Sequence, residues 1–259
     1  MTAVISFFEQ LGGRAIGAIH RLGFASRFLL LTLRNSGMCF RRFSLVVREI
    51  YFAGVLSLII ILVSGLFVGM VLGLQGYDTL VRYGSSSALG VLVALSLVRE
   101  LGPVVAGLLF ASRAGSAITA EIGLMKATEQ LAAMEMMAVD PIKRVVVPRF
   151  LGGVIAMPLL AAIFSVIGLY GAQLIGVQIM GVDSGSFWSQ MRNGVDLADI
   201  RQGIVKSVIF GIACSLIAVY EGYFATPTAA GVGRATTRTV VTSAVVVLFL
   251  DYLLTSAFL

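Results

Sequence analysis

Charged residues are scarce in this chain. They make up 12% of its 259 residues, whereas 58% of the residues are apolar and the mean hydropathy is +0.99. A soluble domain contains about 25% charged residues. The chain also lacks the alternating segments of roughly ten residues that form a transmembrane β-barrel. It does contain several uncharged runs of transmembrane length. The composition therefore predicts an all-α polytopic membrane protein.

Residues that bind metals or act as nucleophile and base are also few. The chain has one histidine, His20, and two cysteines, Cys39 and Cys214, which lack the spacing of a metal site or a disulfide. Its three lysines follow Met, Ile and Val, whereas a phosphate-binding P-loop needs Gly before Lys. We therefore expect no metal site, no cofactor and no catalytic residue in this chain. If the protein uses ATP, a separate chain must hydrolyse it.

Five apolar segments predict five transmembrane helices, at about residues 52–75, 88–111, 150–181, 203–221 and 239–258. The polar residues 183–200 predict a loop on the outer side that contains an interfacial helix.

The lysines and arginines outside these segments are unevenly distributed. Fourteen lie in residues 1–49, 112–149 and 223–239, against three on the opposite side of the membrane. Because positively charged loops stay in the cytoplasm, we expect a cytoplasmic N-terminus and, after five crossings, a periplasmic C-terminus. The net charge of +6 then reflects membrane topology, and nucleic acid is not expected as a partner.

Residues 1–49 differ in character from the remainder of the chain, residues 50–259. They contain seven arginines and an apolar stripe at helical spacing that begins at Val4 and Phe8 and ends at Leu22. A second short apolar helix is expected from Phe24 to Leu33. Basic amphipathic helices of this kind lie in the cytoplasmic interface of a membrane. The sequence thus predicts N-terminal interfacial helices that precede the five spans.

Three glycines recur every fourth residue in the first predicted span: Gly65, Gly69 and Gly73. This spacing places them on one face of the helix and lets another helix or a lipid chain approach the backbone closely. Tight helix packing and direct contact with a substrate are both open interpretations.

Four charged residues interrupt the apolar spans: Arg99, Glu100, Lys206 and Asp251. Each costs about 2.5–3.5 kcal/mol at the centre of a bilayer, so they must face protein or a polar cavity. Pro103 follows the first two and cannot donate a hydrogen bond to the carbonyl of Arg99. We hypothesise that the four residues line or gate a cavity between the helices. The alternative is that ion pairs, Arg99 with Asp251 or Glu100 with Lys206, only hold the helices together.

Residues 112–149 form the longest polar interruption between spans. A mixed, methionine-rich helix is expected there, with one stripe through Leu124, Thr128, Leu131 and Glu135. Unbranched methionine side chains adapt to irregular surfaces, so this cytoplasmic helix suits a partner's groove. The alternative is a helix that lies on the lipid headgroups. The residues expected to couple the chain to an ATPase are Glu129, Met134, Glu135, Met136 and Asp140.

Three stretches resemble the MlaE permease family over essentially the whole chain. They are GMVLGLQGY (69–77), ALSLVRELGPVVAGLLFASRAGSAITAEIGLMKATEQLAAMEMMAVDP (94–141) and TPTAAGVGRATTRTVV (226–241). The resemblance implies a permease subunit of an ABC transporter in the bacterial inner membrane. Such a transporter moves phospholipids between the inner and outer membranes and maintains the lipid asymmetry of the outer membrane.

The same resemblance implies the partners. The permease would be a homodimer bound to an MlaF-like ATPase that holds ATP and magnesium, an MlaB-like cytoplasmic subunit and an MlaD-like periplasmic ring. Residues 1–49 would be the elbow helices, and residues 50–259 would be the permease domain, with the coupling helix within 112–149. The cavity of Arg99, Glu100, Lys206 and Asp251 would then hold lipid. The charges within the spans leave a second interpretation open, in which the chain is an ion-coupled carrier or channel that works without an ATPase.

Overall fold

The computed structural model describes residues 23–24, 26–37 and 43–258, and every regular element in this part of the chain is helical. Five helices are long and apolar enough to cross a membrane, which confirms the predicted all-α polytopic fold. These five spans are Phe43–Arg82, Ser86–Ala127, Ile142–Ile179, Leu197–Tyr223 and Ala229–Phe258.

Three spans consist of several helical pieces. The first contains α2 (Phe43–Ala53), η2 (Val55–Ser57) and α3 (Leu58–Arg82). The second contains η3 (Ser86–Ala88), α4 (Leu89–Leu95), η4 (Ser96–Leu101), α5 (Gly102–Phe110), η5 (Ala111–Gly115) and α6 (Ser116–Ala127). The third contains η6 (Ile142–Val146), α8 (Val147–Gln173) and η7 (Leu174–Ile179).

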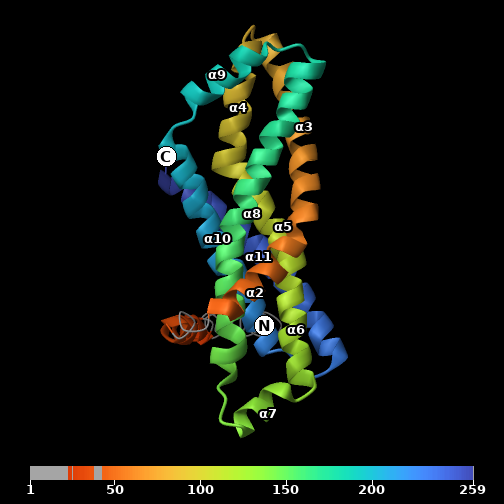
Figure 1. The fold of residues 1–259 in the computed structure, drawn as a ribbon, viewed down its shortest axis with the longest axis vertical. Helices are drawn as coiled ribbons and strands as arrows, with labels where there is room; N and C mark the ends of the chain where they lie inside the picture. The colour runs from red at the N-terminus through yellow and green to blue at the C-terminus, as the bar shows by residue number, and fades with distance from the viewer. Residues whose placement is uncertain (1–22, 25, 38–42, 259) are drawn as a thin grey trace, which may run out of the picture.

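The last two spans are single helices, and two short helices connect the spans. The single helices are α10 (Leu197–Tyr223) and α11 (Ala229–Phe258). The connecting helices are α7 (Gln130–Met136) and α9 (Ser184–Gly194), which lie at opposite ends of the molecule in Figure 1. A helix within residues 183–200 was predicted, and α9 confirms it.

The helices extend beyond the predicted apolar segments, most of all in the first and second spans. Most of the predicted loop 112–149 is helical, because α6 and η6 prolong the two spans on either side of it. Hydropathy identifies only the part of a helix that is apolar. The continuation α6 contains three alanines together with Glu121, Leu124, Met125 and Lys126, all of them good helix formers.

The predicted continuous helix through Leu124 and Glu135 is wrong. Helix α6 ends at Ala127, and Glu129 adopts a left-handed conformation with φ of 58° before α7 begins. The break changes the helical phase, so the predicted stripe does not form. Leu131 alone of its four residues is buried. Residues 128–140 instead form a hairpin-like turn around α7.

Helices α3 and α8 lie side by side and form the most extensive contact of the bundle. The glycine face of α3 makes this contact. A Cβ atom on Gly65 would lie 3.0 Å from the carbonyl oxygen of Phe164, and one on Gly69 would overlap the backbone of Gly168. One on Gly73 would lie 3.0 Å from the Cα of Ala172. The three glycines therefore set the distance between the two helices.

Four segments of the spans are π-helical: η4, η5, η6 and η7. The first of them immediately precedes α5, whose first turn contains Pro103. Because proline has no N–H group to donate, the helix changes its hydrogen-bond pattern there. This segment carries Arg99 and Glu100.

The first span is broken between its N-terminal helix α2 and α3. Helix α2 ends at Ala53, and Gly54 separates it from η2 and α3. The guanidinium of Arg113 donates a hydrogen bond to the free carbonyl of Phe52, at 2.7 Å, and so stabilises this break. Among the predicted N-terminal helices, residues 26–36 are helical, whereas the predicted stripe from Val4 to Leu22 lies outside the described residues.

Candidate functional site

Three elements bring three of the four predicted intramembrane charges together. The π-helical segment η4 carries Glu100, α10 carries Lys206, and α11 carries Asp251. These elements pack against one another around the apolar core that includes Phe110 and Phe210. Helix α10 thus places its lysine between a carboxylate from each neighbour.

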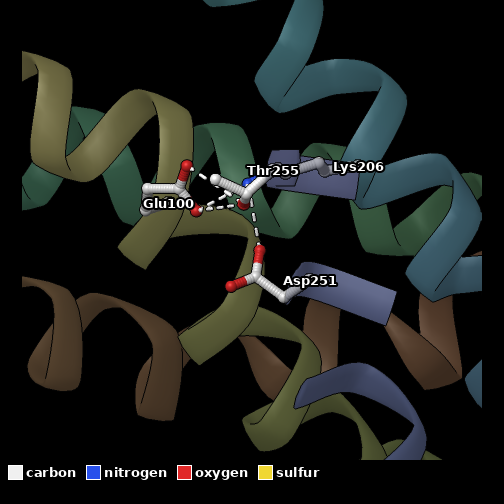
Figure 2. A network of polar contacts seen from close by, with 4 residues as sticks. All are labelled: Glu100, Lys206, Asp251 and Thr255. Carbon is white, nitrogen blue, oxygen red and sulfur yellow. Dashed lines mark hydrogen bonds and ion pairs between the residues drawn. The ribbon is translucent and has the colours of Figure 1, made fainter. Parts of the chain in front are cut away.

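Figure 2 shows how Lys206 is held. Its ammonium group is within 2.5 Å of Oε2 of Glu100 and 3.0 Å of Oδ1 of Asp251, and it donates to Oγ1 of Thr255 at 2.7 Å. An ammonium group has three donors, and all three are used here. The lysine side chain is 0% exposed, whereas the side chains of Glu100 and Asp251 are 36% and 23% exposed. The burial of this cation is therefore fully compensated.

Thr255 is the member of this cluster that the sequence analysis missed. Its hydroxyl accepts from Lys206 and donates to Glu100 at 3.1 Å, so it links the two. It lies four residues after Asp251, which places both on one face of α11. That spacing is the sequence signal that could have identified it.

Arg99 belongs to a separate ion pair. Its guanidinium contacts Oδ1 of Asp199 through two nitrogens, at 2.5 and 2.7 Å. The other oxygen of Asp199 accepts from the backbone N–H of Asp196, which caps the start of α10. Sequence reasoning missed Asp199 because it lies in the polar stretch assigned to the outer loop. The suggested pair of Arg99 with Asp251 is replaced by this one, whereas Glu100 with Lys206 is present.

Arg99 and Glu100 on η4 have different partners, but both are partly exposed and both pair with a buried residue of α10. About half of the Arg99 side chain is exposed (46%), as is about a third of Glu100. Their partners Asp199 and Lys206 are both buried in α10. Helix α10 therefore holds two half-exposed charges of opposite sign at its surface.

An apolar recess of about 240 Å³ lies between η4, α5, α8 and α10, and none of the four predicted charges lines it. Val98 and Ile200, the neighbours of Arg99 and Asp199 in the chain, both contribute to its wall. Its two serines, Ser165 and Ser207, donate to carbonyls of their own helices and leave the wall apolar. The remaining residues of the wall are Pro103, Pro158, Ala161, Ala162, Val166, Leu169, Gly203 and Ile204.

The hairpin around α7 exposes the residues expected to couple to a partner. Met136 is 83% exposed, and Glu129, Glu135 and Asp140 are exposed as well, while Met134 is half-buried. Leu131 is 7% exposed and packs into the apolar cluster beneath the hairpin. The hairpin is thus anchored on one side and open to a partner on the other.

No group of three or more potential metal ligands occurs among residues 23–24, 26–37 and 43–258. The charged side chains of the candidate site hold one another in these contacts. Their arrangement can bind or exclude a charged group, and it contains no pairing of nucleophile and base.

Comparisons with known proteins agree with one another. A family model described as Permease MlaE matches residues 46–257. The chain is 53% identical to the intermembrane phospholipid transport system permease protein MlaE of Haemophilus influenzae, over 98% of this chain and 97% of that protein. It is 37% identical to a probable ABC transporter permease protein of Rickettsia bellii, over 98% of each. An Arabidopsis thaliana protein, chloroplastic TRIGALACTOSYLDIACYLGLYCEROL 1, is 32% identical over 78% of this chain and 58% of that protein.

Proposed function

This chain belongs to the MlaE permease family, and we propose that it is the membrane-spanning subunit of an ABC transporter that moves phospholipids between the inner and outer membranes. Such transport would maintain the lipid asymmetry of the outer membrane. The chain itself would be non-catalytic, because ATP and magnesium would be bound by a separate ATPase.

The observation that best supports this proposal is an apolar recess between η4 and α10, two elements that the half-exposed Arg99 joins through its ion pair with Asp199. A phospholipid combines a charged headgroup with acyl chains, so its site needs mostly apolar walls and a few polar groups. The recess is lined almost entirely by apolar atoms, and Val98 and Ile200 in its wall are the chain neighbours of Arg99 and Asp199. The fully compensated Lys206 is better suited to a gate that holds the helices together than to direct headgroup binding.

We therefore assign different tasks to the four predicted cavity residues. Arg99 would contact the anionic part of the headgroup. Glu100 would contact a cationic part of the headgroup, or Lys206 when this lysine moves away from Asp251. Lys206 and Asp251 would close the path by tying α10 to α11. Opening would require Glu100 or Asp251 to leave Lys206, which fits their partial exposure.

The partners follow from family membership and from the exposed hairpin. We propose a homodimer in the inner membrane, an MlaF-like ATPase docked on α7, an MlaB-like cytoplasmic subunit and an MlaD-like periplasmic ring. The α7 end would face the cytoplasm, in agreement with the surplus of lysine and arginine there. The C-terminus would then lie on the periplasmic side.

Arg99→Ala is expected to lower ATP-dependent phospholipid transfer about tenfold in proteoliposomes that contain the assembled complex. The reason is the loss of a charged hydrogen-bond donor, which contributes about 1.5–3 kcal/mol. Because the substitution also strips buried Asp199 of its partner, it should be made in an Asp199→Asn background and compared with Asp199→Asn alone.

Arg82→Ala is a suitable control, since this arginine forms an exposed pair with Asp78. Unchanged transfer in the Arg99 variant would show that this arginine has a structural role only. Transfer without any ATPase subunit, driven by an ion gradient, would instead favour an ion-coupled carrier and contradict the proposed function.

Glu135→Lys is expected to reduce copurification of the ATPase about tenfold while the permease keeps its fold. Glu135 is exposed on α7, so its reversal removes a charge from the docking surface without disturbing the core. A tenfold loss corresponds to about 1.4 kcal/mol, less than the loss of one partner of a buried charge pair costs at an interface. Pull-down of the ATPase and thermal unfolding of the permease measure the two effects.

Arg192→Glu reverses a charge on α9, at the other end of the molecule, and provides the matched control. Equal copurification in the two variants would contradict docking at α7.

A further inference from the structure

A second charged cluster lies near the α7 end, away from the candidate lipid site. Arg149 on α8 is 14% exposed and contacts two carboxylates from different helices. Its Nη2 is 3.0 Å from Oε2 of Glu121 on α6, and its Nε is 4.0 Å from Oε2 of Glu49 on α2. The Nη1 group also donates to the carbonyl of Val145, at 3.5 Å, within its own helical region. The guanidinium thus lies between two carboxylates, and it donates to Glu121 from both Nη2 and Nε, at 3.0 and 3.4 Å.

Helices α2 and α8 are packed as one body. A Cβ atom on Gly152 of α8 would lie 2.6 Å from the Cβ of Glu49 and 3.1 Å from its carbonyl carbon. Because the backbones already touch, α2 must follow any movement of α8. Glu49 and Arg149 therefore stay close whatever happens to the rest of the bundle.

Helix α6 is less closely joined to this body. A cleft of about 70 Å³ separates α2 from α6, and both glutamates of the cluster, Glu49 and Glu121, contribute to its wall. Ala114 of η5 and Ala117 of α6 line the other side of the cleft, and their short side chains leave it unfilled. The Arg149–Glu121 ion pair bridges from α8 to α6 beside this cleft. Movement of α6 relative to α2 and α8 would therefore strain this pair first.

The charged cluster lies on the two helices that flank the hairpin around α7. Helix α6 leads into α7, and the chain returns through η6 to α8. Glu121 thus lies on α6 and Arg149 on α8, and these two helices are the arms that carry α7 between them. A contact between the arms fixes their spacing, whereas a contact with Glu49 links the hairpin to α2.

We propose that Arg149 is a positioning residue that exchanges its partner Glu121 for Glu49 when the two arms of α7 separate. Through this exchange, a movement of the hairpin changes the spacing of the arms and is transmitted to α2. This inference rests on the proposed function, in which an ATPase moves α7. The exchange keeps one ion pair in each state, so neither state leaves the half-buried guanidinium without a partner. Such an arrangement gives two states of similar free energy, which is the requirement for a switch.

The arm spacing can be measured directly by pulsed electron paramagnetic resonance. Spin labels would be attached at Leu124→Cys on α6 and Arg144→Cys on η6, both exposed positions, in a Cys39→Ser, Cys214→Ala background. In the permease in nanodiscs, Glu121→Gln should shift the distance distribution to longer values, because Arg149 then prefers Glu49. Glu49→Gln should leave the resting distribution unchanged. An unchanged distribution in Glu121→Gln would overturn the proposal.

Glu49→Gln distinguishes a switch from a static clamp. In the assembled complex it should lower the lipid transferred per ATP about fivefold, the low end of typical coupling effects, although the resting spacing is normal. Asp78→Asn, in an exposed surface pair, is the control. Normal coupling in Glu49→Gln would contradict the exchange of partners. If the wild-type complex transfers no lipid, the proposed function fails, while the distance measurement still tests the arm contact independently.

Discussion

Lys206→Met is expected to destabilise the permease by about 3 kcal/mol and to abolish phospholipid transfer. Removing one partner of a buried ion pair leaves an uncompensated charge, which costs about 3–5 kcal/mol. Here two carboxylates, Glu100 and Asp251, would lose the ammonium group that they share. Both are partly exposed, so the effect should lie at the lower end of that range. Thermal unfolding in detergent and transfer in proteoliposomes measure the two losses.

The variant that removes every charge of this cluster separates stability from function. Lys206→Met combined with Glu100→Gln and Asp251→Asn leaves no unpaired charge, so most of the stability should return. If the cluster acts as a gate, transfer stays low in this stable protein. Recovery of transfer together with stability would show that the charges only hold the helices together, as the alternative interpretation of the sequence allowed.

Gly69→Ala is expected to be the most damaging single methyl substitution among the glycines of α3. The added Cβ would overlap the carbonyl group of Gly168, and backbone on both sides has no rotamer with which to yield. Helices α3 and α8 would have to separate along their whole contact. Overpacking of a core typically costs 1–3 kcal/mol, and we expect about 3 kcal/mol here, with reduced insertion and yield.

Two other glycines calibrate this prediction. Gly65→Ala should be milder, because its Cβ would lie 3.0 Å from the carbonyl oxygen of Phe164. Gly233→Ala on α11 should be neutral or slightly stabilising, since nothing lies within 4 Å of its Cβ and alanine favours helix. Equal stability of Gly69→Ala and Gly233→Ala would mean that the two helices are farther apart than the structure places them.

The sequence predicted those features that depend on composition and on spacing within one helix. Five apolar segments were enough to predict five spans, because the cost of burying charge in a membrane is large. The glycine spacing likewise placed three residues on one face of α3. The pairing of Lys206 with Glu100 was one of the two pairs considered.

Features that depend on the register between helices could not be predicted in this way. Asp199 lies at the start of α10 in a stretch that resembles a loop, and only packing brings it to Arg99. The π-helical segment η4 alters the phase of the residues that follow it, which no hydropathy pattern records. The break at Glu129 needs a left-handed residue that is not glycine, and local propensity argues against it.

That break has a counterpart on the other side of α7. Ala138, like Glu129, has a φ of 58°, so both turns that flank the helix hold a non-glycine residue in the region where glycine is favoured. Each costs about 1 kcal/mol relative to glycine. Glycine would relieve that cost, but it would also give each turn a wide range of conformations. With side chains at both positions fewer backbone conformations are open to the two turns, so α7 is held more firmly between α6 and η6 than glycines would hold it.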